Sequence, residues 1–149
     1  MNKRIKAAVA AATLGLVLAG AGVAQADTSQ NNGSNALVVE NTANGLGEGY
    51  VWWVNGSGDP VDSKSTPAFA EAEFYDYQTG YTLNGWLERS TDGGKTWTQV
   101  SGTHALSSTT TDSSSAPTDG YYDGPGYLAR ACFQFTSWSG AAVHCSPAI

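Results

Sequence analysis

The chain has 149 residues, of which 13 are acidic and seven are basic, so its formal charge at neutral pH is −6. Three of the basic residues lie within the first six positions; residues 27–149 keep all 13 acidic residues and four basic ones, a formal charge of −9. This balance argues against a nucleic-acid-binding protein, which needs basic side chains to neutralise phosphates, and against adhesion to an anionic membrane surface. A chain of this length forms one domain with a modest core.

Residues 1–26 have the three parts of a secretory signal peptide. The start is positively charged, residues 7–23 are apolar, and Ala24-Gln25-Ala26 supplies the small residues of a cleavage site. We expect cleavage after Ala26 and secretion from the cell. Because the apolar run ends at a cleavage site with no stop-transfer pattern, we expect no membrane insertion.

The exported chain begins with a polar segment. Residues 27–35 (DTSQNNGSN) lack apolar periodicity, so we expect a flexible N-terminal arm ahead of a domain at residues 36–149. Aromatic and β-branched runs then predict strands, and clusters of Gly, Pro, Asn and Asp predict loops. The next segments are a strand at 36–40 (ALVVE), a turn or loop at 41–49, a strand at 50–55 (YVWWVN) and a loop at 56–67.

Alternation of apolar and polar residues predicts the remaining strands. In residues 68–77, Ala70, Ala72 and Phe74 would face inward, although the helix formers in AFAEAEF make a helix the competing interpretation. We expect further strands at 81–90, 96–100, 127–137 and 141–146, and turns at 78–80, 91–95 and 139–140. Residues 107–115 predict a flexible loop or an irregular edge, and residues 116–126 predict a loop.

The chain has two cysteines, Cys132 and Cys145. A secreted protein meets an oxidising environment, so we expect these two to pair and to close a loop of about 14 residues. About seven short strands, turn signals between them and no strong helix are typical of an antiparallel β-sandwich. The sequence therefore predicts a single all-β sandwich with one disulfide.

Two segments resemble parts of a known fold family. Residues 81–100 (YTLNGWLERSTDGGKTWTQV) look like the C–C′ hairpin of bacterial fibronectin type III or related immunoglobulin-like domains, and residues 127–132 (YLARAC) resemble their F strand. The resemblance implies that Tyr127 is the tyrosine-corner residue, with its hydroxyl bonded to a nearby backbone group. It also implies that residues 141–146 are strand G, so the disulfide would join neighbouring strands. A fold likeness of this kind implies no chemistry.

Residues 90–97 (STDGGKTW) also fit the Asp-box, S-x-D-x-G-x-T-W, of sialidases and other β-propellers. In such a turn Asp92 would accept backbone N–H bonds, Gly94 would take a positive φ, and Trp97 would pack beneath the hairpin. A propeller repeats its motif over at least four blades, for which this chain is too short. We therefore interpret the motif as a structural turn.

Patterns for catalysis or metal binding are weak. His104 and His144 stand apart from any nucleophile motif, and Asp119 with Asp123 matches a calcium loop poorly. Carboxylates on adjacent predicted strands could serve a glycosidase, but solvated strand faces look the same. These carboxylates are Glu71, Glu73, Asp76 and Glu88. We expect no enzyme activity, no cofactor and no metal.

The chain is rich in aromatic residues, with five Trp, seven Tyr and four Phe. Trp52 and Trp53 would point to opposite faces of one strand, so one of them would be partly exposed. An exposed Trp or Tyr stacks on sugars or anchors a protein partner. Tyr121, Tyr122 and Trp138 are further candidates for such a surface.

The arm offers another kind of binding site. It is either a frayed end joined to an edge strand or a segment that docks in a partner's groove by strand addition. The candidate partner-binding residues belong to the arm and to the strand after it. They are Asp27, Thr28, Ser29, Gln30, Leu37, Val38 and Val39.

In size, export and a free N-terminal arm, the chain resembles the small secreted adaptor of bacterial umbrella-shaped toxin particles. That resemblance implies a non-catalytic protein–protein adaptor, whose arm, here residues 27–40, docks into a lectin-like subunit while the body binds repeats of the toxin stalk. Its partners would be other secreted proteins. One alternative is a carbohydrate-binding module that uses exposed Trp and Tyr. Another is an inhibitor of secreted hydrolases that uses the hairpin tip at 135–140.

Overall fold

Strands make up the regular structure of the described residues. The computed structural model describes residues 28–31, 35–42, 45–64, 68–107, 109, 113–136 and 141–149. These ranges hold eleven strands, and no membrane-spanning helix is found within them. The signal peptide predicted at residues 1–26 lies outside them, as do Asp27 and Trp138.

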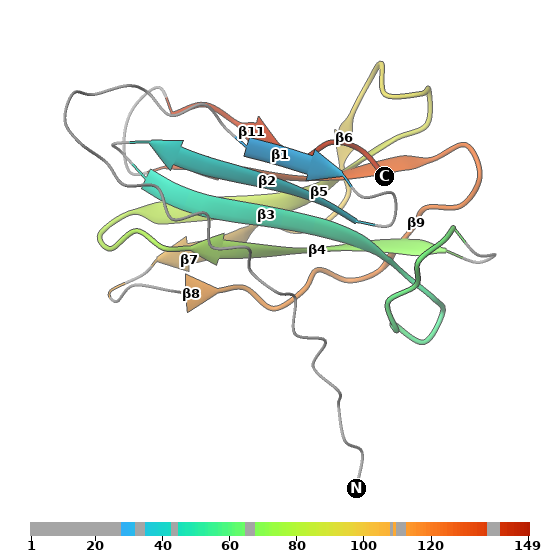
Figure 1. The fold of residues 1–149 in the computed structure, drawn as a ribbon, viewed down its shortest axis with the longest axis horizontal. Coiled ribbons are helices and arrows are strands. Elements are labelled where there is room, and N and C mark those ends of the chain that lie inside the picture. Colours follow the sequence, from blue (N-terminus) through green and yellow to red (C-terminus); the bar gives the residue numbers. More distant parts are fainter. Residues whose placement is uncertain are drawn as a thin grey trace, which may run out of the picture.

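The first of two antiparallel sheets carries the N-terminal strands. Its members are β1 (Thr28–Asn31), β2 (Asn35–Thr42), β3 (Gly45–Val54), β4 (Phe69–Asp76), β8 (Ser113–Ser114) and β9 (Tyr121–Tyr122). The order is β1-β2-β3-β4-β8, and β9 pairs with another part of β4. Figure 1 shows β1 to β4 following one another across this layer.

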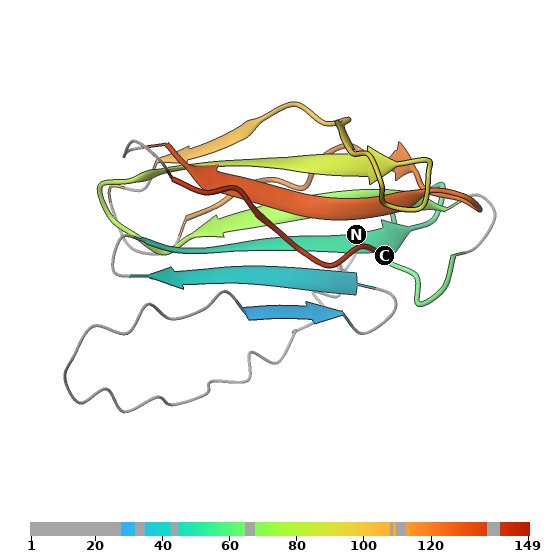
Figure 2. The ribbon, with the colours of Figure 1, turned by 90° about the horizontal axis from the view of Figure 1, so that it is seen from above.

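The second sheet is built from the C-terminal half of the chain. Its members are β5 (Thr82–Ser90), β6 (Thr98–Gln99), β7 (His104–Ser107), β10 (Leu128–Phe135) and β11 (His144–Cys145). The order is β11-β10-β5-β6, and β7 also pairs with β5. Figure 2 shows β5 and β10 side by side, with β1 at the outer border of the first sheet.

The core lies between the inner faces of the two sheets. Along β4, burial alternates so that Ala70, Ala72 and Phe74 are completely buried, which confirms the predicted strand and excludes the helix. Burial of apolar surface, at roughly 25 cal/mol per Å², is the main force that holds such layers together. The second sheet contributes Leu83, Leu87, Leu106, Ala129, Ala131, Phe133 and Phe135.

The loop predicted at residues 41–49 is wrong for the described residues, because β2 continues to Thr42 and β3 begins at Gly45. Gly47 and Gly49 face the core. A Cβ on Gly47 would lie 2.6 Å from Leu83 Cδ1, and one on Gly49 would lie 3.2 Å from Phe133 Cδ1. Glycine is used here because side chains of the opposite sheet fill the space that a Cβ would need.

The Ser/Thr-rich segment at 107–115 was predicted as a flexible loop or an irregular edge, and the Pro/Gly-rich segment at 116–126 as a loop. Both contain short strands where they run beside β4. Ser115 N–H donates to Phe74 O (2.9 Å), and its Oγ accepts from Phe74 N–H (3.0 Å). Thr118 makes the same pair of bonds with Ala72. Hydroxyl side chains therefore accept hydrogen bonds from backbone N–H groups at the edge of β4. With these short strands included, the described residues hold eleven strands instead of the seven expected.

The predicted disulfide between Cys132 and Cys145 is confirmed. The two residues are direct partners in the antiparallel pairing of β10 and β11, so the bond joins neighbouring strands of one sheet. On the loop-entropy model, closing a loop of this size stabilises a protein by roughly 3 kcal/mol.

The N-terminal arm differs from the flexible segment expected at residues 27–35, because Thr28–Asn31 form strand β1. Thr28 lies opposite Val39 and Gln30 opposite Leu37 in the pairing with β2. Asn31 Nδ2 also donates to Ala148 O at 2.7 Å, which ties this strand to the C-terminal segment. By pairing with the edge of β2, this polar segment satisfies backbone N–H and C=O groups that would otherwise bond to water.

Candidate binding surface

The outer face of the first sheet alternates aromatic and acidic side chains. Inward positions of β3 and β4 are buried, so the intervening residues point outward. Across the two strands, Glu48 lies opposite Tyr75, Tyr50 opposite Glu73, and Trp52 opposite Glu71. We name these six residues, together with Tyr77, the acidic aromatic face.

The tyrosines of this face pack against one another. The rings of Tyr50 and Tyr75 meet edge to face at 5.6 Å, and Tyr75 stacks on Tyr77 at 6.2 Å. Tyr77 Oη donates to Glu48 Oε2 at 3.1 Å. The result is a continuous aromatic platform with carboxylates set beside the rings.

Burial and the neighbouring carboxylates keep these phenols protonated. Burial, followed by the charge of Glu48, raises the pKa of Tyr50 to about 12. Burial also raises the pKa of Tyr75 and of Tyr77, and nearby glutamates add to both shifts. At neutral pH the tyrosines are therefore neutral donors, and the negative charge of the face resides on the glutamates.

No cationic side chain of the described residues offsets these glutamates. Among those residues, the ion pairs join Lys64 to Asp123 and Arg130 to Glu88. Arg89 lies on β5 and Lys95 in the turn after it, so both belong to the second sheet. The first sheet thus presents uncompensated negative charge beside apolar rings.

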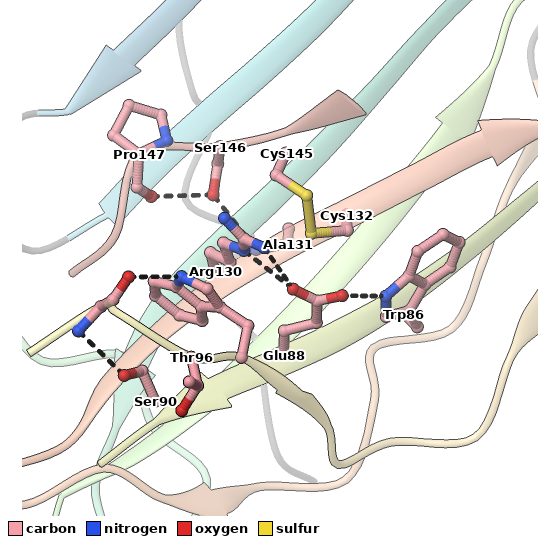
Figure 3. Close-up of polar contacts among 12 residues, drawn as sticks. Trp86, Glu88, Ser90, Thr96, Arg130, Ala131, Cys132, Cys145, Ser146 and Pro147 are labelled. Carbon is pink, nitrogen blue, oxygen red and sulfur yellow. Dashed lines mark hydrogen bonds and ion pairs between the residues drawn. A yellow bond between two sulfur atoms is a disulfide. The ribbon is translucent and has the colours of Figure 1, made fainter. Parts of the chain in front are cut away.

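The outer face of the second sheet is already internally paired. Figure 3 shows the Glu88 carboxylate between the Arg130 guanidinium and the Trp86 indole. Arg130 donates to Glu88 Oε2 from Nη2 at 2.6 Å and from Nε at 2.9 Å, while Trp86 Nε1 donates to Oε1 at 2.9 Å. The guanidinium also lies 4.1 Å from the ring centre of Trp97. With its partners satisfied, this cluster serves the fold.

A possible metal cluster at this position is ruled out by its own bonds. Carboxylate and sulfur atoms of Glu88, Cys132 and Cys145 lie within 4.8 Å of one another. Both sulfur atoms are used in the disulfide, and the carboxylate is used by Arg130. The grouping offers no thiolate ligand.

The Asp-box turn has the geometry that its sequence predicts. Asp92 Oδ1 accepts from the backbone N–H groups of Lys95 (3.0 Å) and Thr96 (2.9 Å), and Gly94 has a φ of 86°. Trp97 Nε1 donates to Gly94 O at 3.0 Å, which holds the indole against the hairpin. All of these contacts lie within the turn itself.

Trp53 is half-buried and belongs to a cluster around the completely buried Asp123. Its Nε1 donates to Asp123 Oδ2 at 2.9 Å, and Lys64 Nζ lies 3.2 Å from the same oxygen. Lys64 also donates to Tyr127 O at 2.6 Å. Burial raises the pKa of Asp123, and the Lys64 ammonium opposes that rise. Of the two aspartates considered for a calcium loop, Asp119 is exposed and Asp123 is completely buried.

Some of the aromatic candidates face outward, and others pack against the core. Trp52 faces outward beside Glu71, whereas Trp53 and Tyr121 pack against the core. Tyr122 is exposed and meets Phe69 edge to face at 6.2 Å. Trp138, and with it most of the hairpin tip expected at 135–140, lies outside the described residues.

The candidate binding residues of the arm and of the strand after it differ in exposure. Ser29 and Gln30 are exposed on β1, and Leu37 and Val39 are half-buried on the outward side of β2. Val38 is 2% exposed and belongs to the core, so it offers no surface to a partner.

The carboxylates grouped from the sequence do not meet. Strands β4 and β5 were expected to be adjacent, but they lie in different sheets. Glu71 and Glu73 therefore lie on one outer face and Glu88 on the opposite one, while Asp76 is completely buried.

The histidines take ordinary structural positions. His104, expected in a loop, begins β7, and His144 stacks on Phe133 in the edge strand β11.

Sequence reasoning missed Glu48, Tyr75 and Tyr77 as site residues. The alternation in EAEFYDY carried part of the signal, but the glycines around Glu48 led to a loop prediction. Comparison with protein-family models, curated proteins and solved structures finds no match.

Proposed function

We propose that the chain is a secreted, non-catalytic adaptor or assembly subunit of an extracellular complex, and that it binds a basic protein segment on the acidic aromatic face. The observation that carries this proposal is the pairing of Glu48, Glu71 and Glu73 with outward aromatic rings, and with no cationic neighbour in the part of the chain that the structure describes. Aromatic faces attract ammonium and guanidinium groups, and adjacent carboxylates strengthen that attraction.

Charge complementarity favours a protein partner over a neutral glycan. A sugar ring stacks on one open aromatic face. Here Tyr50, Tyr75 and Tyr77 are half-buried and pack on one another, and carboxylates lie beside them. A lysine- or arginine-bearing segment satisfies both the rings and the charges.

The finer fold assignment and the arm belong to the same proposal. An immunoglobulin- or fibronectin-like sandwich is supported by the β5–β6 hairpin and by the disulfide between β10 and β11. A role for residues 27–35 in docking is supported by the position of β1 at the sheet edge, where a partner strand can add. Membership of an antibacterial toxin particle is the specific form of this adaptor role suggested by the overall layout.

The test is capture of partners from culture supernatant with tagged protein. The face variant Glu48→Gln with Glu73→Gln is compared with Asp59→Asn with Asp62→Asn, which removes the same charge from an exposed loop outside the face. We expect the wild type and the loop variant to retain the same stoichiometric protein partners and the face variant to lose most of them. Equal capture by the two double variants would contradict the proposal, as would wild-type protein recovered alone.

A carbohydrate-binding module is the second candidate, favoured by the ring series of Tyr50, Tyr75 and Tyr77 beside Trp52. Glycan arrays separate the two functions. A glycan module would retain binding in the Glu48→Gln, Glu73→Gln variant and lose it in Trp52→Ala.

A further inference from the structure

A small open hollow lies at the end of the acidic aromatic face where β3 ends and β4 begins. Its volume is about 220 Å³, and its lining includes Val54, Phe69 and Glu71, with Gly56, Gly58 and Gly120 on the loop side. Trp52, opposite Glu71 in the strand pairing, joins the hollow to the rest of the face.

The glycines keep the Glu71 carboxylate accessible. A Cβ on Gly120 would lie 3.5 Å from Glu71 Oε1, 3.4 Å from Phe69 Cβ and 3.8 Å from Val54 Cγ2. A Cβ on Gly58 would lie 4.0 Å from the same oxygen. One carboxylate oxygen therefore lies beside Gly120 and Gly58, at a hollow that the Phe69 side chain also lines.

The Glu71 carboxylate has no cationic partner among the described residues. Burial and the neighbouring charge of Asp119 raise its pKa, so both effects oppose ionisation in the free protein. A cation placed in the hollow would oppose this rise, because a nearby opposite charge favours the ionised carboxylate.

The shape of the hollow favours a primary ammonium group. A lysine head is a compact charge with three donors, and its aliphatic stem packs on apolar surface. Phe69 is half-buried and provides that surface, and Glu71 lines the same hollow. A guanidinium, by contrast, is best matched by two carboxylate oxygens side by side.

We infer that this hollow receives the ε-ammonium group of one lysine side chain of the partner, with Glu71 as its counter-ion and with Phe69 against its stem. The inference rests on the proposed function, because it names the anchor residue of the segment that binds the acidic aromatic face.

The experiment titrates the purified protein with a blocked Ser-Lys-Ser-Lys-Ser-Lys-Ser peptide, and NMR follows the backbone amides of Gly58 and Gly120. Matched probes are the same peptide with acetylated lysines, the arginine version and a glucosamine oligomer. The variants are Glu71→Gln, which removes the counter-ion, and Gly120→Ala, which places a methyl group 3.5 Å from Glu71 Oε1, in ordinary van der Waals contact. Glu73→Gln removes a charge from the face outside the hollow, and Asp62→Asn removes an exposed charge elsewhere. Melting curves establish that each variant is folded.

The lysine peptide should shift the Gly58 and Gly120 signals, and acetylation should abolish the effect. Glu71→Gln should weaken binding roughly tenfold, because a charged hydrogen bond is lost. Gly120→Ala should weaken binding at least about threefold, because a methyl group then occupies the space beside Glu71 Oε1. Glu73→Gln should weaken it only about twofold, and Asp62→Asn should leave it unchanged.

Several outcomes would overturn the inference. One is an equal loss in Glu71→Gln and Glu73→Gln, another is full affinity in folded Gly120→Ala, and a third is equal affinity for the arginine peptide. If partner capture still depends on Glu48 and Glu73 in these cases, the proposed function stands without the hollow. If the glucosamine oligomer binds in a Glu71-dependent way and the lysine peptide does not bind, the choice of a protein ligand is overturned. If the lysine peptide does not bind and partner capture does not depend on the face, the proposed function is overturned too.

Discussion

Gly85, on β5 of the second sheet, lies against the ring of Phe74 on the first sheet. A Cβ there would lie 2.2 Å from Phe74 Cγ, well inside van der Waals contact. Phe74 is completely buried, so its ring has no open space into which it can move. Phe74 can therefore occupy this position only because residue 85 has no side chain.

Gly85→Ala should lower the free energy of unfolding by about 2 kcal/mol, because a methyl group forced into a packed core displaces its neighbours. Urea denaturation measures the change. Gly102→Ala is the matched control, since a Cβ at that position has no heavy atom within 4 Å, and its effect should stay within about 0.5 kcal/mol. Equal unfolding midpoints for the two variants would refute the close approach of Phe74 to β5.

At the residue scale, the sequence predicted the sites whose partners are close in the chain. The contacts of Asp92 all lie within residues 90–96, so the motif alone was enough to place them. The partners of Trp53 are Lys64 and Asp123, and no local rule connects residues so far apart. For the same reason, the choice between an outward Trp52 and an outward Trp53 needed the register of β3 and β4.

At the scale of elements, the β5–β6 hairpin depends on its turn. Asp92 accepts from Thr96 Oγ1 at 2.6 Å as well as from two backbone N–H groups. The hydrogen bonds from Thr96, followed by that from Ser90, lower the pKa of Asp92 to about 2. Because the pKa in the folded protein is below the usual aspartate value, folding favours the ionised form.

The stability contributed by Asp92 should be complete above about pH 4 and should be lost as the pH falls towards 2. In Asp92→Asn, the melting temperature should be lower at pH 7, and the difference from wild type should shrink over that acidic range. Calorimetric melts from pH 7 to pH 2 test this, with Asp62→Asn as an exposed control outside the turn. A wild-type-minus-variant difference that stays constant with pH would contradict the role of the ionised carboxylate.

Strand prediction succeeded where alternation was undisturbed and failed where glycine faced the core. Strands β4, β5 and β10 bury every second residue over most of their length, and the sequence located all three. The start of β3 was missed because Gly47 and Gly49 signal a loop by composition. What places them in a strand is contact with Leu83 and Phe133 on the other sheet, which no local pattern contains.

At the scale of the whole molecule, charge is divided between the two sheets. The outward carboxylates of β3 and β4 have no cationic partner among the described residues, while Arg89 and Arg130 lie on the second sheet. The formal charge of −9 for residues 27–149 adds a long-range attraction for any basic partner. The acidic aromatic face could not be predicted from the sequence alone, because it depends on which strands become neighbours.

Binding of the lysine peptide should weaken as salt is raised, because the Debye length falls from about 10 Å at 0.1 M to about 3 Å at 1 M. Isothermal titration over a series of NaCl concentrations measures the slope. The Glu48→Gln, Glu73→Gln variant should have a shallower slope than wild type, and the Asp59→Asn, Asp62→Asn variant should differ less. Affinity independent of salt would count against electrostatic recognition.

Strand β1 also bears on how the protein resists self-association. Its residues Thr28–Asn31 are all polar, and they cover the edge of β2, whose outward side carries Leu37 and Val39. An uncovered edge strand with apolar side chains is a template for pairing with other copies of a chain, as in amyloid-like aggregation. Proteolytic removal of these four polar residues would thus leave the edge of β2 open to pairing with another copy of the chain.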